Sequence, residues 1–257
     1  MEGKGLTGGI HVSHNKTVQI EIGGYISNLF RTHFGKGPTA VYVTIEKSFI
    51  TIHFLGFLAG MEKNLLGQNE VKRVLASRDM VIRNLTPEIM QQIEELTGYG
   101  VIEFYTDWNF EKETGLMIGI INKELEKQPM PWPNSEDEQA LRDYLDRASL
   151  IAQKIPEHTD IFWLNDRTLL VQRSGILLEI EKEFIRNGFL DELKLSKRQL
   201  ERRAFQEARP ENVLRGSIEE TFLFWNFEKD RGYTVFRLAK ENQKEKPEGL
   251  HRNMHND

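Results

Sequence analysis

Glycines and a lysine that could hold an anion stand together in Gly35-Lys36-Gly37-Pro38-Thr39. Glycine amides and a lysine amine suit a phosphate or another anion. A phosphate-binding P-loop, however, requires G-x-x-x-x-G-K-[ST] between a strand and a following helix, whereas here a helical pattern comes first and a strand pattern follows. The spacing therefore favours a turn from helix to strand, with anion binding as the alternative.

Two Glu-Lys pairs, Glu62-Lys63 and Glu181-Lys182, each follow the pattern of a hairpin strand. Such pairs ordinarily belong to a solvated or paired helix face of small energetic value. Their recurrence adds a second interpretation, in which both pairs face a seam between two units and fix its register. No Ser-His-Asp arrangement, paired-carboxylate signature or dinucleotide fingerprint lies in a supporting context, so we predict no catalytic residue and lean towards a non-enzyme.

Two histidine pairs, His11-x-x-His14 and His251-x-x-x-His255, lack a third ligand nearby, so we predict no metal site and no cofactor. A basic stretch near residue 200 is interrupted by Glu201 and Glu207. We interpret it as a solvated helix face, with contact to an acidic partner or membrane surface as the alternative. Its cations are Lys194, Lys197, Arg198, Arg202, Arg203 and Arg209.

The sequence contains an internal repeat. Trp108-Asn109-Phe110-Glu111-Lys112 recurs 117 residues later, beginning with Trp225-Asn226, and residues 56–63 match residues 175–182 at an offset of 119. Two blocks in the same order at nearly the same offset indicate a duplication. Each repeated tryptophan is predicted to close one end of a sheet, and a paired aromatic surface that docks a partner is the alternative.

The composition of the 257 residues limits the class of protein. The net charge of −5, with 28% charged residues, argues against overall attraction to nucleic acid or an anionic membrane. The absence of cysteine excludes disulfides and thiol chemistry, and fits a reducing cytosol. No apolar run approaches the roughly 18 to 20 residues that span a bilayer, so we expect a cytoplasmic protein without a membrane span.

Five segments are predicted along the chain. Residues 1–16 form a loose arm, residues 17–126 the first unit, residues 127–135 a linker with three of the eight prolines, residues 136–240 a second, divergent unit, and residues 241–257 a polar disordered tail. Hydrophobic periodicity gives the first unit a helix at residues 22–30, a hairpin at residues 41–55, helices over residues 58–85, and a last hairpin at residues 101–121. Between them we expect a further helix with Thr86 as N-cap and Pro87 as its first residue.

The second unit repeats this order. Its first helix is predicted to start at Ser135 in a capping box with Glu138, and to bury Leu141, Tyr144, Leu145, Ala148 and Ile151. A hairpin at residues 159–172 follows, then two helices, the second opened by Ser196, and a hairpin at residues 218–238. The predicted fold class is α+β, with two αββααββ units. Each is a four-stranded antiparallel sheet with helices on one face, and the two pack as a pseudo-twofold pair.

Three elements of the first unit, Gly35-Lys36-Gly37-Pro38, residues 56–63 and residues 96–101, together resemble the MpsC-like family. The resemblance covers about residues 17–122. It implies an association with a sodium-translocating system that generates membrane potential, and hence a membrane ion or bicarbonate-linked transport complex as partner. The second unit departs from this pattern, with Ile155-Pro156-Glu157 and Arg215-Gly216-Ser217 in the places of the glycine-rich turn and the Leu-Thr-Gly element.

Three functions are compatible with the sequence. The leading hypothesis, which rests on the resemblance, is a non-enzymatic accessory or regulatory protein. The second is a small-molecule or anion sensor, or an enzyme, with its ligand in a groove between the units beside Gly35–Pro38. The third is a dimer-like scaffold, either a monomer with an internal pseudo-dimer or a homodimer. Twelve residues are candidates for binding: Gly35, Lys36, Gly37, Pro38, Glu62, Lys63, Trp108, Asn109, Glu181, Lys182, Trp225 and Asn226.

Overall fold

The computed structural model describes residues 7–123, 132, 137–208, 214 and 216–239, with the side chains of residues 7–15 left aside. The predicted linker, apart from Trp132, and the predicted tail lie outside these residues. Within these residues, fourteen helices and strands form two units of the same order, and the predicted αββααββ repeat is confirmed. The first unit contains α1 (Thr7–Phe34), β1 (Ala40–Glu46), β2 (Phe49–Leu55), α2 (Gly60–Gly67), α3 (Val71–Thr97), β3 (Val101–Asn109) and β4 (Thr114–Ile121). The second contains α4 (Glu138–Ala152), β5 (His158–Asn165), β6 (Thr168–Ser174), α5 (Glu179–Arg186), α6 (Leu190–Glu207), β7 (Ile218–Asn226) and β8 (Arg231–Leu238).

Each unit contains a four-stranded antiparallel sheet, as predicted. The strand orders are β1-β2-β4-β3 and β5-β6-β8-β7, so the two hairpins of a unit meet through their second strands. These inner strands are buried on both faces, because one face meets helices and the other meets the second sheet. In β4, for example, Met117 belongs to the helix-side core, whereas Leu116 and Ile118 belong to the core between the sheets.

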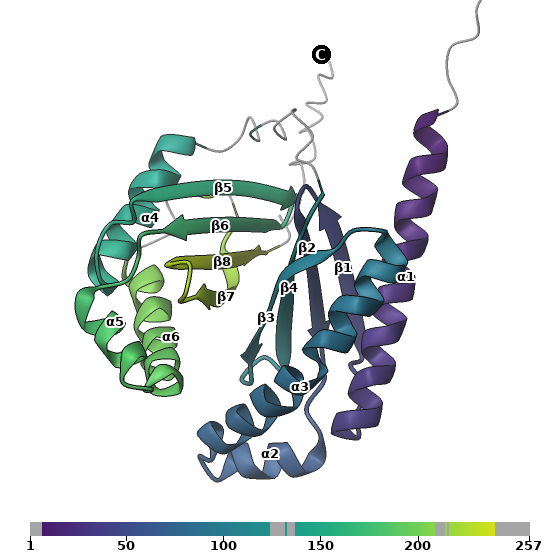
Figure 1. Cartoon of the computed structure of the whole chain (residues 1–257), viewed down its shortest axis with the longest axis horizontal. Helices are drawn as coiled ribbons and strands as arrows, with labels where there is room; N and C mark the ends of the chain where they lie inside the picture. The colour runs from purple at the N-terminus through teal and green to yellow at the C-terminus, as the bar shows by residue number, and fades with distance from the viewer. Residues whose placement is uncertain (1–6, 124–131, 133–136, 209–213, 215, 240–257) are drawn as a thin grey trace, which may run out of the picture.

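The molecule therefore has four layers, with helices outside and the two sheets face to face within (Figure 1). Helices α1 and α3 cover the first sheet, while α4 and α6 cover the second. Strand β3 contacts β7 and β1 contacts β5, so equivalent strands meet across the seam, and the predicted pseudo-twofold packing is confirmed. None of the helices in the described part of the chain combines the length and apolar character that crossing a bilayer requires.

Two helices of the first unit differ from prediction. Helix α1 begins at Thr7, inside the predicted arm, because residues 7–16 contain no proline that would stop the helix from extending backwards. Helix α3 continues through the predicted start at Thr86, whose hydroxyl donates to the carbonyl oxygen of Ile82 at 2.8 Å. Pro87 removes only one backbone donor, and the buried stripe of α3 continues past it to Ile93.

Three details of the second unit also differ. Helix α4 begins at Glu138, with Asp137 as N-cap accepting from the Ala140 amide at 3.0 Å, whereas Ser135 lies outside the described residues. Ile151 is 46% exposed, because it lies in the last turn of α4 to one side of the buried stripe. Helix α6 begins at Leu190 rather than near Ser196, directly after Gly188 with its left-handed φ of +83°.

Candidate functional site

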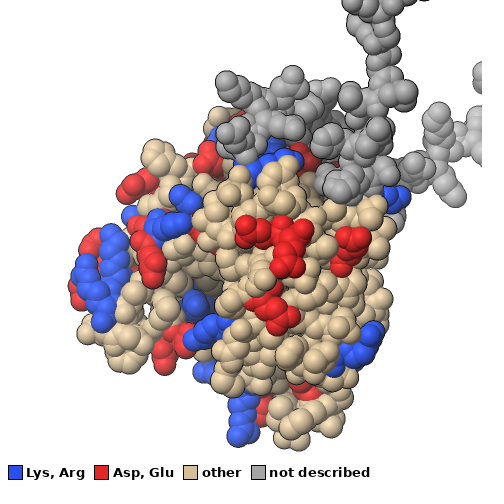
Figure 2. Space-filling view, turned by 45° about the vertical axis from the view of Figure 1, so that its right-hand side comes forward, with Lys and Arg blue, Asp and Glu red and all other residues tan. Residues whose placement is uncertain are grey.

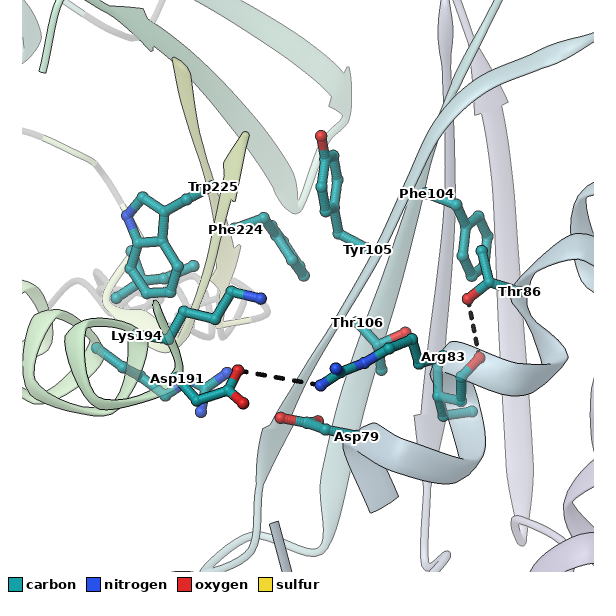
Figure 3. Close-up of a pocket in the computed structure, with 13 residues that line it drawn as sticks. Asp79, Arg83, Thr86, Phe104, Tyr105, Thr106, Asp191, Lys194, Phe224 and Trp225 are labelled. Atoms are coloured by element: carbon teal, nitrogen blue, oxygen red, sulfur yellow. Dashed lines mark hydrogen bonds and ion pairs between the residues drawn. The ribbon is translucent and has the colours of Figure 1, made fainter. Parts of the chain in front are cut away.

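A crevice of about 190 Å³ lies where the two units meet, between α3 of the first and α6 of the second (Figure 3). Strands β3 and β7 supply the remainder of its lining, so it exists only because the two sheets pack together. On the face shown in Figure 2, the surface is hollowed at a place bordered by both basic and acidic side chains. Pockets between units that combine apolar walls with a few convergent polar groups are typical ligand sites.

Five charged side chains line the crevice. Asp79 and Arg83 come from α3, one helical turn apart, while Asp191, Lys194 and Arg198 come from α6. Arg83 lies 3.9 Å from the Asp191 carboxylate, the pair joined by a dashed line in Figure 3. The Lys194 amine points into the space between the helices, and no hydrogen bond or ion pair joins it to another residue that the structure describes.

Burial shifts the pKa values of two of these groups in opposite directions. Burial raises the pKa of Asp79 above its usual value, even though the hydrogen bond from Trp108 acts in the other direction. Burial likewise lowers the pKa of Lys194, against the attraction of Asp191 and Asp79. Both shifts have the same origin, since removal from water disfavours whichever form is charged. Paired shifts of this kind inside a crevice mark a candidate functional site.

The walls of the crevice are aromatic and aliphatic. Phe104 lies on the α3 side and Phe224 on the α6 side (Figure 3). Between them, the Thr106 hydroxyl is buried and has no hydrogen-bond partner among the described residues. A buried hydroxyl without a partner costs about 1–3 kcal/mol.

The repeated Asn and Lys side chains join the two units reciprocally. Asn109 Nδ2 lies 3.4 Å from Glu220 Oε1 of the other unit, and Lys112 Nζ donates to the Glu219 carbonyl oxygen at 2.7 Å. In the opposite direction, Lys229 Nζ donates to Glu103 Oε1 at 2.6 Å. Because Glu103 and Glu220 lie 117 residues apart, the contact between asparagine and glutamate is made twice, whereas Lys112 binds a backbone oxygen and Lys229 a carboxylate. We call this set the reciprocal contacts.

Both glutamates of the reciprocal contacts are held ionised. Burial alone would raise their pKa, but hydrogen bonds hold it below the usual 4.5 in each case. Glu103 receives hydrogen bonds from Lys229, Tyr105, Asn226 and Tyr233, and Glu220 receives them from His53 and Thr114. The Asn226 side chain thus contacts the partner unit, as Asn109 does.

The two repeated tryptophans lie inside their own units. Trp108 is 2% exposed and Trp225 is 6% exposed, so neither presents an aromatic surface to a partner, and that alternative is wrong. Trp108 Nε1 donates to Asp79 Oδ1 at 3.0 Å, and Trp225 Nε1 donates to Glu201 Oε1 at 2.9 Å. Each indole thus fixes a carboxylate on the covering helix, and in the first unit that carboxylate faces the crevice.

The Glu-Lys pairs bind within their units and do not face the seam, so the interpretation that they set its register is wrong. Glu62 pairs with Arg78 at 2.6 Å and also accepts from the Ala59 amide, while Lys63 pairs with Glu113. Arg78 is fully buried, and its guanidinium carbon lies between 4.3 and 4.8 Å from the ring centroids of Phe34, Phe57 and Trp108.

The second pair repeats this arrangement with different chemistry. Glu181 accepts from the Leu178 amide and pairs at 3.2 Å with Lys197, which lies 119 residues after Arg78. Lys182 pairs with Glu179 on the surface at 2.7 Å. Glu62 and Glu181 therefore each lie in the first turn of a short helix, and each pairs with a buried cation on the helix that follows.

The interpretation of the basic stretch on α6 as a solvated face is wrong for Lys194, which lines the crevice, and for three further cations. Lys197 is only 2% exposed and also pairs with Glu201 at 3.3 Å. Arg198 Nε lies 2.9 Å from the carboxylate of Asp107, and a terminal guanidinium nitrogen of Arg202 lies 2.8 Å from the same carboxylate. Asp107 is fully buried in β3 of the first unit and also accepts from the Leu223 amide at 3.0 Å. Arg209 lies outside the described residues.

The glycine-rich turn is separate from this crevice. Gly35 has a left-handed φ of +73° after α1, and Lys36 Nζ donates to the Leu58 carbonyl oxygen at 3.0 Å. A Cβ on Gly37 would meet the Ser27 carbonyl oxygen at 2.9 Å, so the turn packs closely on α1. Pro38 lines a second, wider groove of about 1010 Å³ against the Asn165–Arg167 turn. Among the described residues that line this groove, Pro38 is the one that belongs to the predicted Gly35–Pro38 turn.

The sequence analysis missed the crevice residues. A signal was present for Asp79, which stands four residues after Leu75 and three before Ile82 on the buried stripe of α3. A carboxylate at such a position needs a partner or a ligand. Lys194 carried no comparable signal, because the α3 residues that it faces, Asp79 and Arg83, come from a distant part of the chain. The side chains of both predicted histidine pairs lie outside those that the structure describes.

Comparison with protein families identifies the first unit. Residues 14–123 match the family described as "Na+-translocating membrane potential-generating system (MpsC)". The predicted resemblance is confirmed for this unit, whereas the assignment of the second unit as a divergent copy of the same family stays a prediction. Comparison with curated proteins and with solved structures finds no match to the chain.

Proposed function

We propose that this chain, whose residues 14–123 form an MpsC family domain, is a cytoplasmic, non-enzymatic accessory or regulatory protein of a membrane ion transport system. The observation that carries the proposal is the family match, because the family is described by a system that translocates sodium and generates membrane potential. The second unit completes the fold, since it covers the inner face of the first sheet and supplies the partners of Asp107.

Co-purification and membrane potential together test this role. A tagged full chain should recover a membrane-embedded subunit from gently solubilised cells, and loss of the chain should reduce the sodium-dependent membrane potential measured with a voltage-sensitive dye. Complementation with Glu179→Gln, which changes only an exposed α5 carboxylate, serves as the matched control. Recovery of no membrane subunit, with an unchanged potential, would refute the role.

A ligand-sensing role is favoured by a separate observation, the crevice with its oppositely shifted Asp79 and Lys194. A ligand that binds only the folded chain must raise its melting temperature. A thermal-shift screen of chemically diverse small molecules tests this role, provided that each hit is repeated on Phe224→Ala, which enlarges the crevice. The role fails if no compound gives a shift that depends on Phe224.

A further inference from the structure

We propose that the crevice between α3 and α6 binds a small organic monoanion, a carboxylate attached to an apolar ring or branched chain, with its charge at Lys194. This inference deepens the ligand-sensing role proposed above and rests on it. The size, charge balance and walls of the crevice each restrict the ligand in a different way.

The size of the crevice admits one ring. An apolar cavity of about 150 Å³ is enough to hold benzene. The crevice offers about 190 Å³, which leaves room for a carboxylate on a six-membered ring.

The charged side chains of the crevice specify a ligand with a single negative charge. The Asp191 carboxylate lies against Arg83, Arg198 pairs with Asp107 below the crevice, and Asp79 accepts from Trp108. Lys194 alone among these cations has no partner in the part of the chain that the structure describes. A partly buried ammonium is costly unless it is paired, so one carboxylate would satisfy it. A second negative charge on the ligand would be repelled by Asp79 and Asp191.

The titration of Lys194 supports the same conclusion. The charged groups that face it are Asp79 and Arg83 from α3, and Asp191 and Arg198 from α6. Burial lowers its pKa in spite of the two carboxylates. A bound anion would favour the charged ammonium and so raise that pKa.

The walls of the crevice specify the remainder of the ligand. Phe104 and Tyr105 are half-buried and offer aromatic surface, where a strongly hydrated anion such as phosphate would lose its water without compensation. The Thr106 hydroxyl, which has no partner among the described residues, is buried beneath this surface. An apolar body with one carboxylate therefore matches the aromatic surface and the unpaired Lys194 ammonium of the crevice.

Calorimetric titration of the full chain with three probes tests the inference. Sodium benzoate should bind, whereas benzamide, a neutral analogue of the same shape, and sodium phosphate should bind at least tenfold more weakly. Lys194→Met keeps the apolar stem and removes the charge, so it should weaken benzoate binding about 10- to 100-fold, the usual range for a charge-assisted hydrogen bond. Lys182→Met, at a surface lysine of α5, is the matched control and should bind benzoate like the unmodified chain.

Each outcome bears on the inference. Equal binding of benzoate and benzamide, tighter binding of phosphate, or unchanged benzoate affinity in Lys194→Met would overturn it, as would no binding of benzoate at all. An unchanged melting temperature of Lys194→Met without ligand shows that its loss of binding is not a loss of folding. If benzamide or phosphate binds and Phe224→Ala abolishes that binding, the ligand-sensing role survives while the monoanion inference fails.

Discussion

Replacing Asp107 with asparagine should weaken the contact between the two units. Asparagine keeps the shape of the side chain and can still accept from the Leu223 amide, but it leaves Arg198 and Arg202 without their shared carboxylate. Arg198 forms an ion pair with Asp107 but no hydrogen bond, because its Nε–H is not aligned with the carboxylate oxygen. Arg202 donates a hydrogen bond to the same carboxylate. Both contacts depend on the charge that the substitution removes.

The magnitude follows from burial. Removing one partner of a buried ion pair typically costs about 3–5 kcal/mol, because the remaining charge stays desolvated. The Arg202 side chain is 32% exposed and can be hydrated again, whereas that of Arg198 is 12% exposed and cannot. We therefore expect the lower end, about 3 kcal/mol. For a chain of this size, that loss corresponds to a decrease of roughly 6–12 °C in melting temperature.

Calorimetric melting of the full chain measures this effect. Arg198→Met should itself lower the melting temperature, and Asp107→Asn should cost less in that background than alone, because the two residues interact directly. Glu179→Gln, which removes an exposed carboxylate from a surface pair, should leave melting unchanged. The reasoning is refuted if Asp107→Asn melts within about 1 °C of the control, or if the two substitutions are additive.

Three further outcomes are expected. The folded-state pKa values of Glu103 and Glu220 lie below the unfolded 4.5, so their stabilisation is present above about pH 4.5 and lost as pH falls through the folded values. In chemical unfolding at pH 3 to 7, the variant with both Glu103→Gln and Glu220→Gln should therefore lose less free energy of unfolding on acidification than the unmodified chain. The same dependence of unfolding free energy on pH in both proteins would contradict this. Gly115→Ala should destabilise by about 1–3 kcal/mol, because its Cβ would lie 2.4 Å from a buried phenylalanine ring. Gly232→Ala should cost less, since its Cβ meets the flexible end of an isoleucine at 2.9 Å, and equal denaturation midpoints would contradict this ordering. Trp225→Phe should lower stability by about 1–3 kcal/mol in urea titration, because a fully buried glutamate loses its indole donor, and a neutral result would show that another donor replaces it.

The sequence predicted those parts of the fold that depend on local pattern. Alternating residues such as Val41, Val43 and Ile45 predicted the β1–β2 hairpin, and the repeat predicted that the second unit would have the same order. Helix α3 was predicted in two pieces, because the intrinsic cost of Pro87 is visible in the sequence, whereas the packing of Ile89 and Ile93 that outweighs it is not.

The candidate site could not be predicted in the same way. Its charges are defined by pairs that lie far apart in the chain, such as Asp107 with Arg202, and local charge patterning makes α6 look solvated. The repeat gave a correct hint, since Asn109 and Asn226 do contact the opposite unit. The surface that they contact depends on how the two sheets pack, and no short stretch of the sequence predicts that packing.

The asymmetry of Asp107 has a consequence for how the duplicated halves recognise each other. Its counterpart in the second unit, 117 residues later, is Phe224, and the counterpart of Arg198, 119 residues earlier, is Asp79. Two first halves that assembled as a dimer would set Asp107 of one copy near Asp79 of the other, and two second halves would leave Arg198 facing a phenylalanine. Only unlike halves match acid to base, so divergence after the duplication has made each half a poor partner for itself. A first half thus pairs better with a second half than with another first half.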